Sequence, residues 1–195
     1  EQFQQEFECE FLGSVNTLIS PAKIKNITFH TPIKSNAGLD VYEDPIKDKT
    51  YVCCVDVARG VSKDYSAFTI IDATQMPYKV VAKYRNNEVK PILFPHTIER
   101  VCKAYNHAHI LVETNDLGQQ IAEALQFELE YDNLLMTTQR GRAGQILGAG
   151  FSGRGSGFGV RMTKQIKKIG CANIKTLIES DKLIINDFNI IEEML

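Results

Sequence analysis

The chain has 195 residues, of which 44% are hydrophobic, and its formal net charge is −2. This length fits one domain with or without a short extension, the apolar content excludes global disorder, and no apolar run approaches the roughly 20 residues of a membrane span. The five cysteines show no C-x-x-C spacing, so we expect reduced thiols in a cytosolic protein and no structural zinc site.

Residues 1–48 are predicted to lead into the domain rather than to belong to it. Phe3, Phe7 and Phe11 have the spacing of one helical face. Prolines then interrupt the chain, at Pro21, Pro32 and Pro45. We therefore place a linker at residues 1–48 and the folded domain at residues 49–195.

Three strands are predicted next. Residues 51–58 form an apolar run, residues 66–72 are rich in β-branched side chains, and residues 79–84 alternate between apolar and polar. Turn sequences separate these runs, at residues 59–64 and at Met76-Pro77. Because the connections are short, we expect three consecutive antiparallel strands.

Helices and strands alternate in the rest of the chain. We expect four helices, at about residues 95–105, in the segment that Asn115 would cap at its N-terminus, at 162–178 and from 189 onward. Strands are expected at 109–113, 134–137 and 183–185, and a loop at 140–159. This order predicts an α/β fold, a mixed β-sheet flanked by helices on both faces. With acids at the tips of the first and fourth strands, it is the ribonuclease-H-like arrangement.

Two of the predicted strands end in a carboxylate, at Asp56 and at Glu113. A charge at the end of a buried strand is costly unless something binds it, and an oxygen-rich pocket suits Mg²⁺ or Mn²⁺. Such ions support phosphodiester hydrolysis. The structural alternative is that Asp56 caps a turn and Glu113 forms a salt bridge. Asp64 is either an auxiliary metal ligand or an Asx-turn residue.

The later part of the chain contains a basic, glycine-rich region. No acidic residue lies between Asp132 and Glu179. Glycine lets backbone approach a phosphate, and arginine binds phosphate bidentately, so this region predicts contact with the DNA backbone. Alternatively, the region is a solvated loop and helix face, or it docks a protein partner. The predicted DNA-binding residues are Arg140, Arg142, Arg154, Arg161, Lys164 and Lys168.

Three motifs resemble the nuclease domain of the large terminase of tailed bacteriophages, with the myophage branch as the nearest match. They are Tyr51-Val-Cys-Cys-Val-Asp56-Val-Ala-Arg-Gly60, Ile110-Leu-Val-Glu113-Thr-Asn and the run over residues 169–185. Residues 5–11 also resemble the segment that joins the ATPase domain of that protein to its nuclease domain. The resemblance implies a ribonuclease-H-like endonuclease that cuts concatemeric phage DNA by metal-activated attack of water on the phosphodiester.

The resemblance also implies roles for individual residues. Asp56 matches the first metal acid of the family, Glu113 matches the second, and Asp64 matches an acid of less certain role near the first motif. The third family acid belongs to a His-Asp-Asp stretch that opens a late helix, and the sequence has no such stretch. Asp187 does not match it, so we expect a domain truncated at its C-terminus.

The implied partners are double-stranded DNA, the ATPase domain, the portal and the small terminase, with no membrane contact. The implied location is the host cytoplasm, with a transient stay at the procapsid and absence from the mature virion. Two other hypotheses stay open from the residues. One is a non-cutting DNA-binding or docking module of the packaging motor, and the other is a Holliday-junction resolvase of the same fold.

Overall fold

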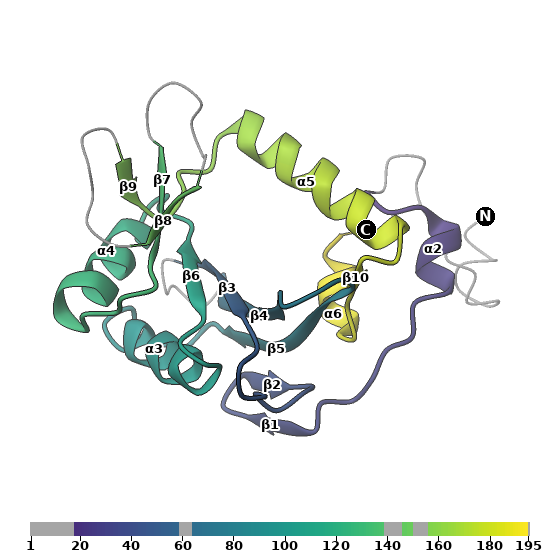
Figure 1. Cartoon of the computed structure of the whole chain (residues 1–195), viewed down its shortest axis with the longest axis horizontal. Coiled ribbons are helices and arrows are strands. Elements are labelled where there is room, and N and C mark those ends of the chain that lie inside the picture. The colour runs from purple at the N-terminus through teal and green to yellow at the C-terminus, as the bar shows by residue number, and fades with distance from the viewer. Residues whose placement is uncertain (1–17, 59–63, 139–145, 150–155, 195) are drawn as a thin grey trace.

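The computed structural model describes residues 18–58, 64–138, 146–149 and 156–194. Its centre is a mixed sheet with the strand order β1-β2-β5-β4-β3-β6, to which β10 adds beside β5 (Figure 1). The strands of this sheet are β1 (Lys34–Asn36), β2 (Leu39–Val41), β3 (Tyr51–Asp56), β4 (Ser66–Asp72), β5 (Tyr78–Asn86), β6 (His109–Val112) and β10 (Leu183–Ile184).

The pairing of the central strands confirms the prediction from the sequence. β3, β4 and β5 are consecutive and antiparallel, and β6 lies parallel to the other edge of β3. β3 ends at Asp56, two residues before the predicted end. Since β3 and β6 run in the same direction, their carboxyl ends meet at one edge of the sheet.

Helices flank both faces of the sheet, as predicted for an α/β fold. Helix α3 (Phe94–Ala104), helix α4 (Gly118–Glu123) and its π-helical continuation (Ala124–Glu128) cover one face. The core on that side includes Phe68, Ile98, Ile110 and Leu125. A second cluster lies on the other face, where α2 (Pro21–Lys25), the end of α5 (Lys164–Glu179) and α6 (Phe188–Glu192) gather around Val80, Ile178 and Ile191.

The region predicted as a loop contains regular structure. β8 (Ile146–Ala149) and β9 (Ser156–Phe158) pair with the two edges of β7 (Leu135–Thr138) in a small antiparallel sheet. The loop prediction for residues 140–159 is therefore wrong for these two segments. Glycine weakens a strand and carries no side chain for an alternating pattern, so the sequence did not reveal them.

The sheet also reaches into the segment predicted to precede the domain. β1 and β2 form a hairpin, and β2 pairs antiparallel with β5. The two-residue turn has positive φ at Ala37 and at Gly38, and a Cβ on Gly38 would lie 2.6 Å from the Arg85 carbonyl oxygen. Residues 34–41 thus extend the sheet, while the linker role of residues 1–48 stays a prediction.

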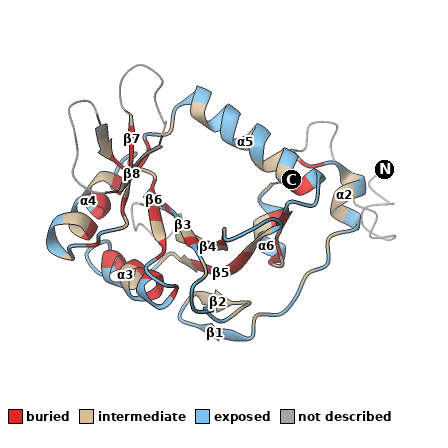
Figure 2. Ribbon diagram, viewed as in Figure 1, coloured by how far each residue is buried: buried red, intermediate tan, exposed pale blue. Residues whose placement is uncertain are grey.

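Helix α5 is exposed over most of its length (Figure 2). It begins after Thr163, whose hydroxyl accepts from the Ile166 amide, and only its C-terminal end reaches the core through Ile178. Within the described part of the chain, no helix has the length and apolar character needed to cross a bilayer. A helix this exposed leaves its basic side chains available to a partner.

Candidate metal and nucleic-acid site

The fold brings Asp56 and Glu113 together. Val55 of β3 pairs with Val112 of β6, and the next residue on each strand is the acid. The Glu113 amide donates to the Val55 carbonyl oxygen at 2.9 Å, which continues the parallel ladder by one step. Neighbouring strands lie about 4.8 Å apart, so the two side chains leave the sheet side by side.

The two carboxylates repel each other. Burial raises the pKa of Glu113, the negative charge of Asp56 raises it further, and the positive charge of Lys167 opposes this. Among the described residues, neither acid forms an ion pair with Lys, Arg or His. The alternative of a salt bridge for Glu113 therefore has no counterpart among the described residues, whereas the turn that Asp56 would cap includes residues 59–63, which lie outside them.

The backbone around Glu113 is held from two sides. The segment after β9 runs beside it, where the Thr114 amide donates to the Val160 carbonyl and the Val160 amide donates to the Val112 carbonyl, at 2.9 and 2.8 Å. On the other side, helix α4 starts against it, because a Cβ on Gly118 would lie 1.7 Å from the Glu113 carbonyl oxygen. This enclosure fixes where the carboxylate emerges.

We expect Gly118→Ala to destabilise the fold by about 2–3 kcal/mol, because the added methyl group meets backbone rather than a movable side chain. Urea unfolding measures this loss. Gly170→Ala is the matched control, since Gly170 lies within α5 and a methyl group added there would meet nothing within 4 Å. That change removes a helix glycine and should stabilise by up to about 1 kcal/mol. Equal effects of the two substitutions would contradict the tight contact at Glu113.

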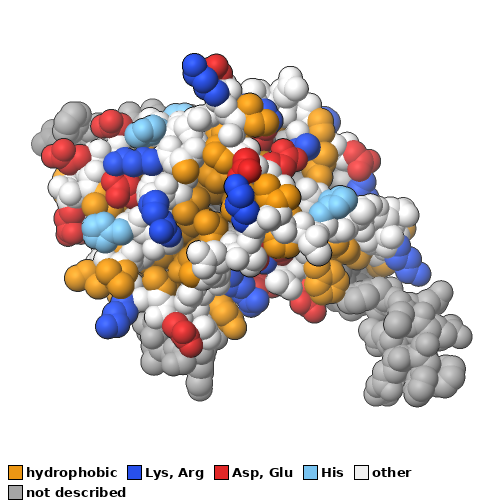
Figure 3. All heavy atoms as spheres, turned by 90° about the horizontal axis from the view of Figure 1, so that it is seen from below, with side chains coloured by type: hydrophobic (Ala, Val, Ile, Leu, Met, Phe, Trp, Pro, Cys, Tyr) orange, Lys and Arg blue, Asp and Glu red, His pale blue; other side chains and the backbone are white. Residues whose placement is uncertain are grey.

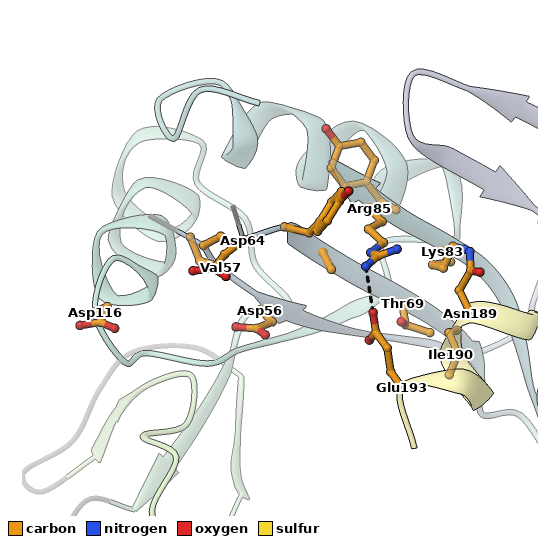
Figure 4. A pocket seen from close by; sticks show the side chains of 14 residues that line it. Asp56, Val57, Asp64, Thr69, Lys83, Arg85, Asp116, Asn189, Ile190 and Glu193 are labelled. Atoms are coloured by element: carbon orange, nitrogen blue, oxygen red, sulfur yellow. Dashed lines mark ion pairs between the residues drawn. The ribbon is translucent and has the colours of Figure 1, made fainter. Parts of the chain in front are cut away.

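A cavity of about 600 Å³ opens beside Asp56 (Figure 4). Asp64 and Asp116 line it from the loops, and Arg85 and Glu193 line its other end. Asp64 is exposed and precedes β4, close to the end of β3 as its sequence position predicted. Its metal role stays a prediction, because the described residues contain no group of three or more His, Cys, Asp or Glu side chains arranged to hold one ion.

Asn115 does not cap the following helix. Helix α4 begins after Leu117 without a side-chain cap, so that prediction is wrong. The Asn115 amide group instead makes a reciprocal pair with Met162, donating to its carbonyl oxygen at 3.2 Å and accepting from its amide at 3.0 Å. The pair ties the Glu113 strand to the segment that enters α5, which a local capping pattern could not reveal.

Three of the predicted DNA-binding residues are described by the structure, and they lie near the junction between the Glu113 strand and the segment that enters α5. Arg161 lines a second cavity of about 990 Å³ between α4, β7 and the start of α5, and Lys164 and Lys168 are exposed on α5. Lys167 was not among the predicted DNA-binding residues, although its charge acts on Glu113. The other three predicted residues, Arg140, Arg142 and Arg154, lie outside the described residues.

The surface on the side away from α5 has a different character. In Figure 3, which looks from below at the molecule of Figure 1, positive and negative side chains are interspersed with hydrophobic ones. A mixed surface of this kind gives no sustained attraction for a polyanion. The α5 side is therefore the better candidate for a nucleic-acid interface.

Two other acids have structural roles. Asp72, at the far end of β4, pairs with Lys49 at 2.5 Å and accepts from Thr74. Asp187 pairs with the buried Lys83 at 2.5 Å, and its other oxygen accepts from the Ile190 amide at the start of α6. The bonds to Asp187 engage both of its carboxylate oxygens, which supports a structural role for this acid.

Comparison with known proteins places this arrangement in a family. Residues 53–194 match the family model described as the terminase RNaseH-like domain. The chain is similar to the large terminase nuclease from thermophilic phage G20c with bound magnesium, with a TM-score of 0.69 and 18% identity over 93% of this chain and 80% of that chain. The large terminase nuclease domain of Thermus phage P74-26 gives a TM-score of 0.65 and 19% identity over 92% and 77% of the respective chains. The ribonuclease-H-like fold predicted from the sequence is thereby confirmed.

Proposed function

Because this chain belongs to the terminase RNaseH-like domain family and shares the fold of large terminase nuclease domains, we propose that it is a divalent-metal-dependent DNA endonuclease. Its substrate is concatemeric double-stranded viral DNA, cut during packaging. The observation that carries the proposal is the adjacency of Asp56 and Glu113 at the carboxyl ends of two parallel strands.

The chemistry of the two acids fits a hard divalent cation. Asp56 and Glu113 would hold Mg²⁺ or Mn²⁺ through carboxylate oxygens, which these ions prefer. A bound cation activates water and offsets the negative charge that develops on the phosphate. The raised pKa of Glu113 means that a proton competes with the cation, so affinity for the cation should increase with pH. Relief of the repulsion between the two carboxylates favours binding.

The surrounding residues would place the DNA. Lys167 lies close enough to Glu113 for its positive charge to lower the pKa of that carboxyl group. Lys164 and Lys168 lie on the same helix, α5. Phosphate contacts by lysine fix the register of the duplex without reading its sequence. The hydrogen-bonded backbone of Glu113 keeps the carboxylate in one place relative to that duplex.

We expect Lys164→Gln combined with Lys168→Gln to weaken binding of a labelled duplex and to reduce the salt slope of log Kd by about two, since each phosphate contact contributes about 0.9. Fluorescence anisotropy between about 50 and 200 mM salt, a window in which this dependence is steep, measures both. Lys47→Gln combined with Lys90→Gln removes the same charge from exposed positions outside α5. If the two double variants show the same Kd and the same salt slope, α5 does not bind DNA.

A second candidate function is a DNA-binding or docking module of the packaging motor that does not cut. The observation that favours it is that the described residues contain no group of three or more His, Cys, Asp or Glu side chains arranged to hold one ion. Incubation of the protein with supercoiled plasmid and Mg²⁺ or Mn²⁺ separates the two functions. Nicked or linear product supports the nuclease, whereas salt-sensitive binding without scission by either metal supports the docking module.

The partners and the location also belong to this proposal. The ATPase domain, the portal and the small terminase are the expected protein partners, and the host cytoplasm, with a transient stay at the procapsid, is the expected location. Solved structures of G20c and P74-26 large terminase nucleases share this fold at 18–19% identity. Co-purification of this chain with the portal protein would test the partner assignment.

A further inference from the structure

Four strands carry one row of side chains across the site. Asp56 of β3 pairs with Ala67 of β4, and Ala67 pairs with Arg85 of β5, while Glu113 stands beside Asp56 on the other side. Residues paired across strands point to the same face of a sheet. The row therefore consists of acid, acid, alanine and arginine, and the small alanine leaves room between the opposite charges.

Arg85 faces the same cavity as Asp56. Both line the space of about 600 Å³, as Figure 4 shows. Ala67, which pairs with both, also lines it. Two strand spacings separate Asp56 from Arg85, or roughly 10 Å. At about 3.4 Å of helix axis per nucleotide, this is a separation of up to about three nucleotides along one DNA strand. Arg85 would thus meet a different phosphate from the one at the carboxylates.

The guanidinium group of Arg85 is already held in position. Its Cζ lies 4.0 Å from the centroid of the Tyr65 ring, a cation–π contact. Its Nη2 pairs with Glu193 Oε1 of the segment after α6 at 3.2 Å. The side chains of Arg85 and Glu193 are 38% and 66% exposed. An ion pair this exposed contributes little to stability, so the fold does not depend on it.

We propose that Arg85, positioned by Tyr65, binds a backbone phosphate of the DNA strand that enters the carboxylate pocket, and that Glu193 occupies Arg85 until DNA displaces it. A planar guanidinium group binds a phosphate with two parallel hydrogen bonds, as it binds a carboxylate. Glu193 acts as a mimic of the phosphate and competes with it. The inference rests on the proposed nuclease function, because that function brings DNA to this pocket.

Binding of a labelled duplex without divalent metal tests the proposal apart from cleavage. We expect Arg85→Gln to raise Kd about tenfold, as for loss of one charge-assisted contact, and to reduce the salt slope by about one. Arg100→Gln is the matched control, because it removes the same charge from α3 on the other face of the sheet. Equal Kd values for these two variants would overturn the proposal.

Variants of Glu193 test the competition. Glu193→Gln should lower Kd severalfold, whereas Glu192→Gln, one residue earlier with the same loss of charge, should lower it less. In the double variant Arg85→Gln/Glu193→Gln, Kd should differ from that of Arg85→Gln only by the smaller, general charge effect that Glu192→Gln shows, because the rest of the Glu193 effect acts through Arg85. An equal gain from Glu193→Gln in the presence and absence of Arg85 would contradict the proposal.

Two further measurements separate loss of binding from loss of fold and from loss of the metal. Thermal unfolding identifies any loss of fold in Arg85→Gln. If that variant does not fold, Arg85→Lys replaces it. Its Kd should be intermediate and its salt slope unchanged, because the charge remains. Asp56→Asn separates the two proposals. If Asp56→Asn cuts plasmid at the wild-type rate, the metal assignment fails, while the metal-free Kd values still decide the role of Arg85.

Discussion

Asp56→Asn and Glu113→Gln should each reduce plasmid cleavage with Mg²⁺ or Mn²⁺ by at least about 10³-fold. A bound divalent cation contributes several kcal/mol of transition-state stabilisation, and each 1.4 kcal/mol or so corresponds to a factor of ten in rate. The amide side chains are close in size to the carboxylates they replace, and neither acid has an ion pair within the described residues. Loss of activity would therefore reflect loss of charge rather than loss of fold.

The controls for this prediction lie on the same chain. Asp132 and Glu128 are exposed, and Asp132→Asn and Glu128→Gln make the same chemical changes away from the strand ends. Both should cut at the wild-type rate. Titration calorimetry with Mn²⁺ gives a second readout, since each site variant should weaken binding of the metal while the controls leave it unchanged. Cleavage by Asp56→Asn or Glu113→Gln at the wild-type rate would remove these residues from the metal site.

The largest expected effect on stability belongs to Asp187→Asn. The side chains of Lys83 and Asp187 are 7% and 4% exposed and pair at 2.5 Å, so removal of the negative charge leaves a buried ammonium group. We expect a loss of about 3 kcal/mol in the free energy of unfolding at pH 7, which lies at the low end for a broken buried pair. Asp40 remains 3.4 Å from Lys83 and limits the cost. Asn still serves as a helix cap for the Ile190 amide.

The effect of Asp187→Asn should depend on pH. Burial by itself raises the pKa of Asp187, but hydrogen bonds from Lys83, Tyr42 and the Ile190 amide outweigh it, and the pKa is lowered. A lowered carboxyl pKa stabilises the fold above the unfolded-state value of about 4, and this stability is lost as the pH falls through the folded-state value. The wild-type and variant unfolding curves should therefore converge in acid.

Urea unfolding at pH 7 and near pH 3 checks this prediction. Asp44→Asn is the matched control, since Asp44 pairs with Lys34 where both side chains are more than half exposed, at 57% and 64%. Its loss should cost less than about 1 kcal/mol. A difference between Asp187→Asn and wild type that stays the same at both pH values would show that charge is not the cause.

Much of the fold is predictable from local patterns. The apolar runs that become β3 and β6 are short, β-branched or cysteine-containing, and bounded by turns, so their strand character is legible in the sequence. The acids that end them stand out because a charge directly after a buried run needs a partner. Both Asp56 and Glu113 were found in this way, and the structure places them side by side.

Features that depend on pairing over long distances were not visible. Asp187 is 104 residues from Lys83, and no local rule links a helix cap to a buried lysine in the middle of a strand. Arg85 looks like an ordinary charged residue near the end of β5 until the register of β3, β4 and β5 aligns it with Asp56. The reciprocal contact of Asn115 with Met162 likewise spans 47 residues.

The amino-acid sequence by itself determined the elements of the central sheet, the two acids at its edge and the resemblance to a nuclease, because each depends on neighbouring residues. Tertiary structure alone decided which side chains share a row across four strands. It also decided which acid, Asp187, is committed to a buried lysine and which acids, Asp56 and Glu113, face one another. The physical reason is that strand register and burial depend on residues far apart in the chain, and a side chain gains its chemistry from the neighbours that folding brings to it.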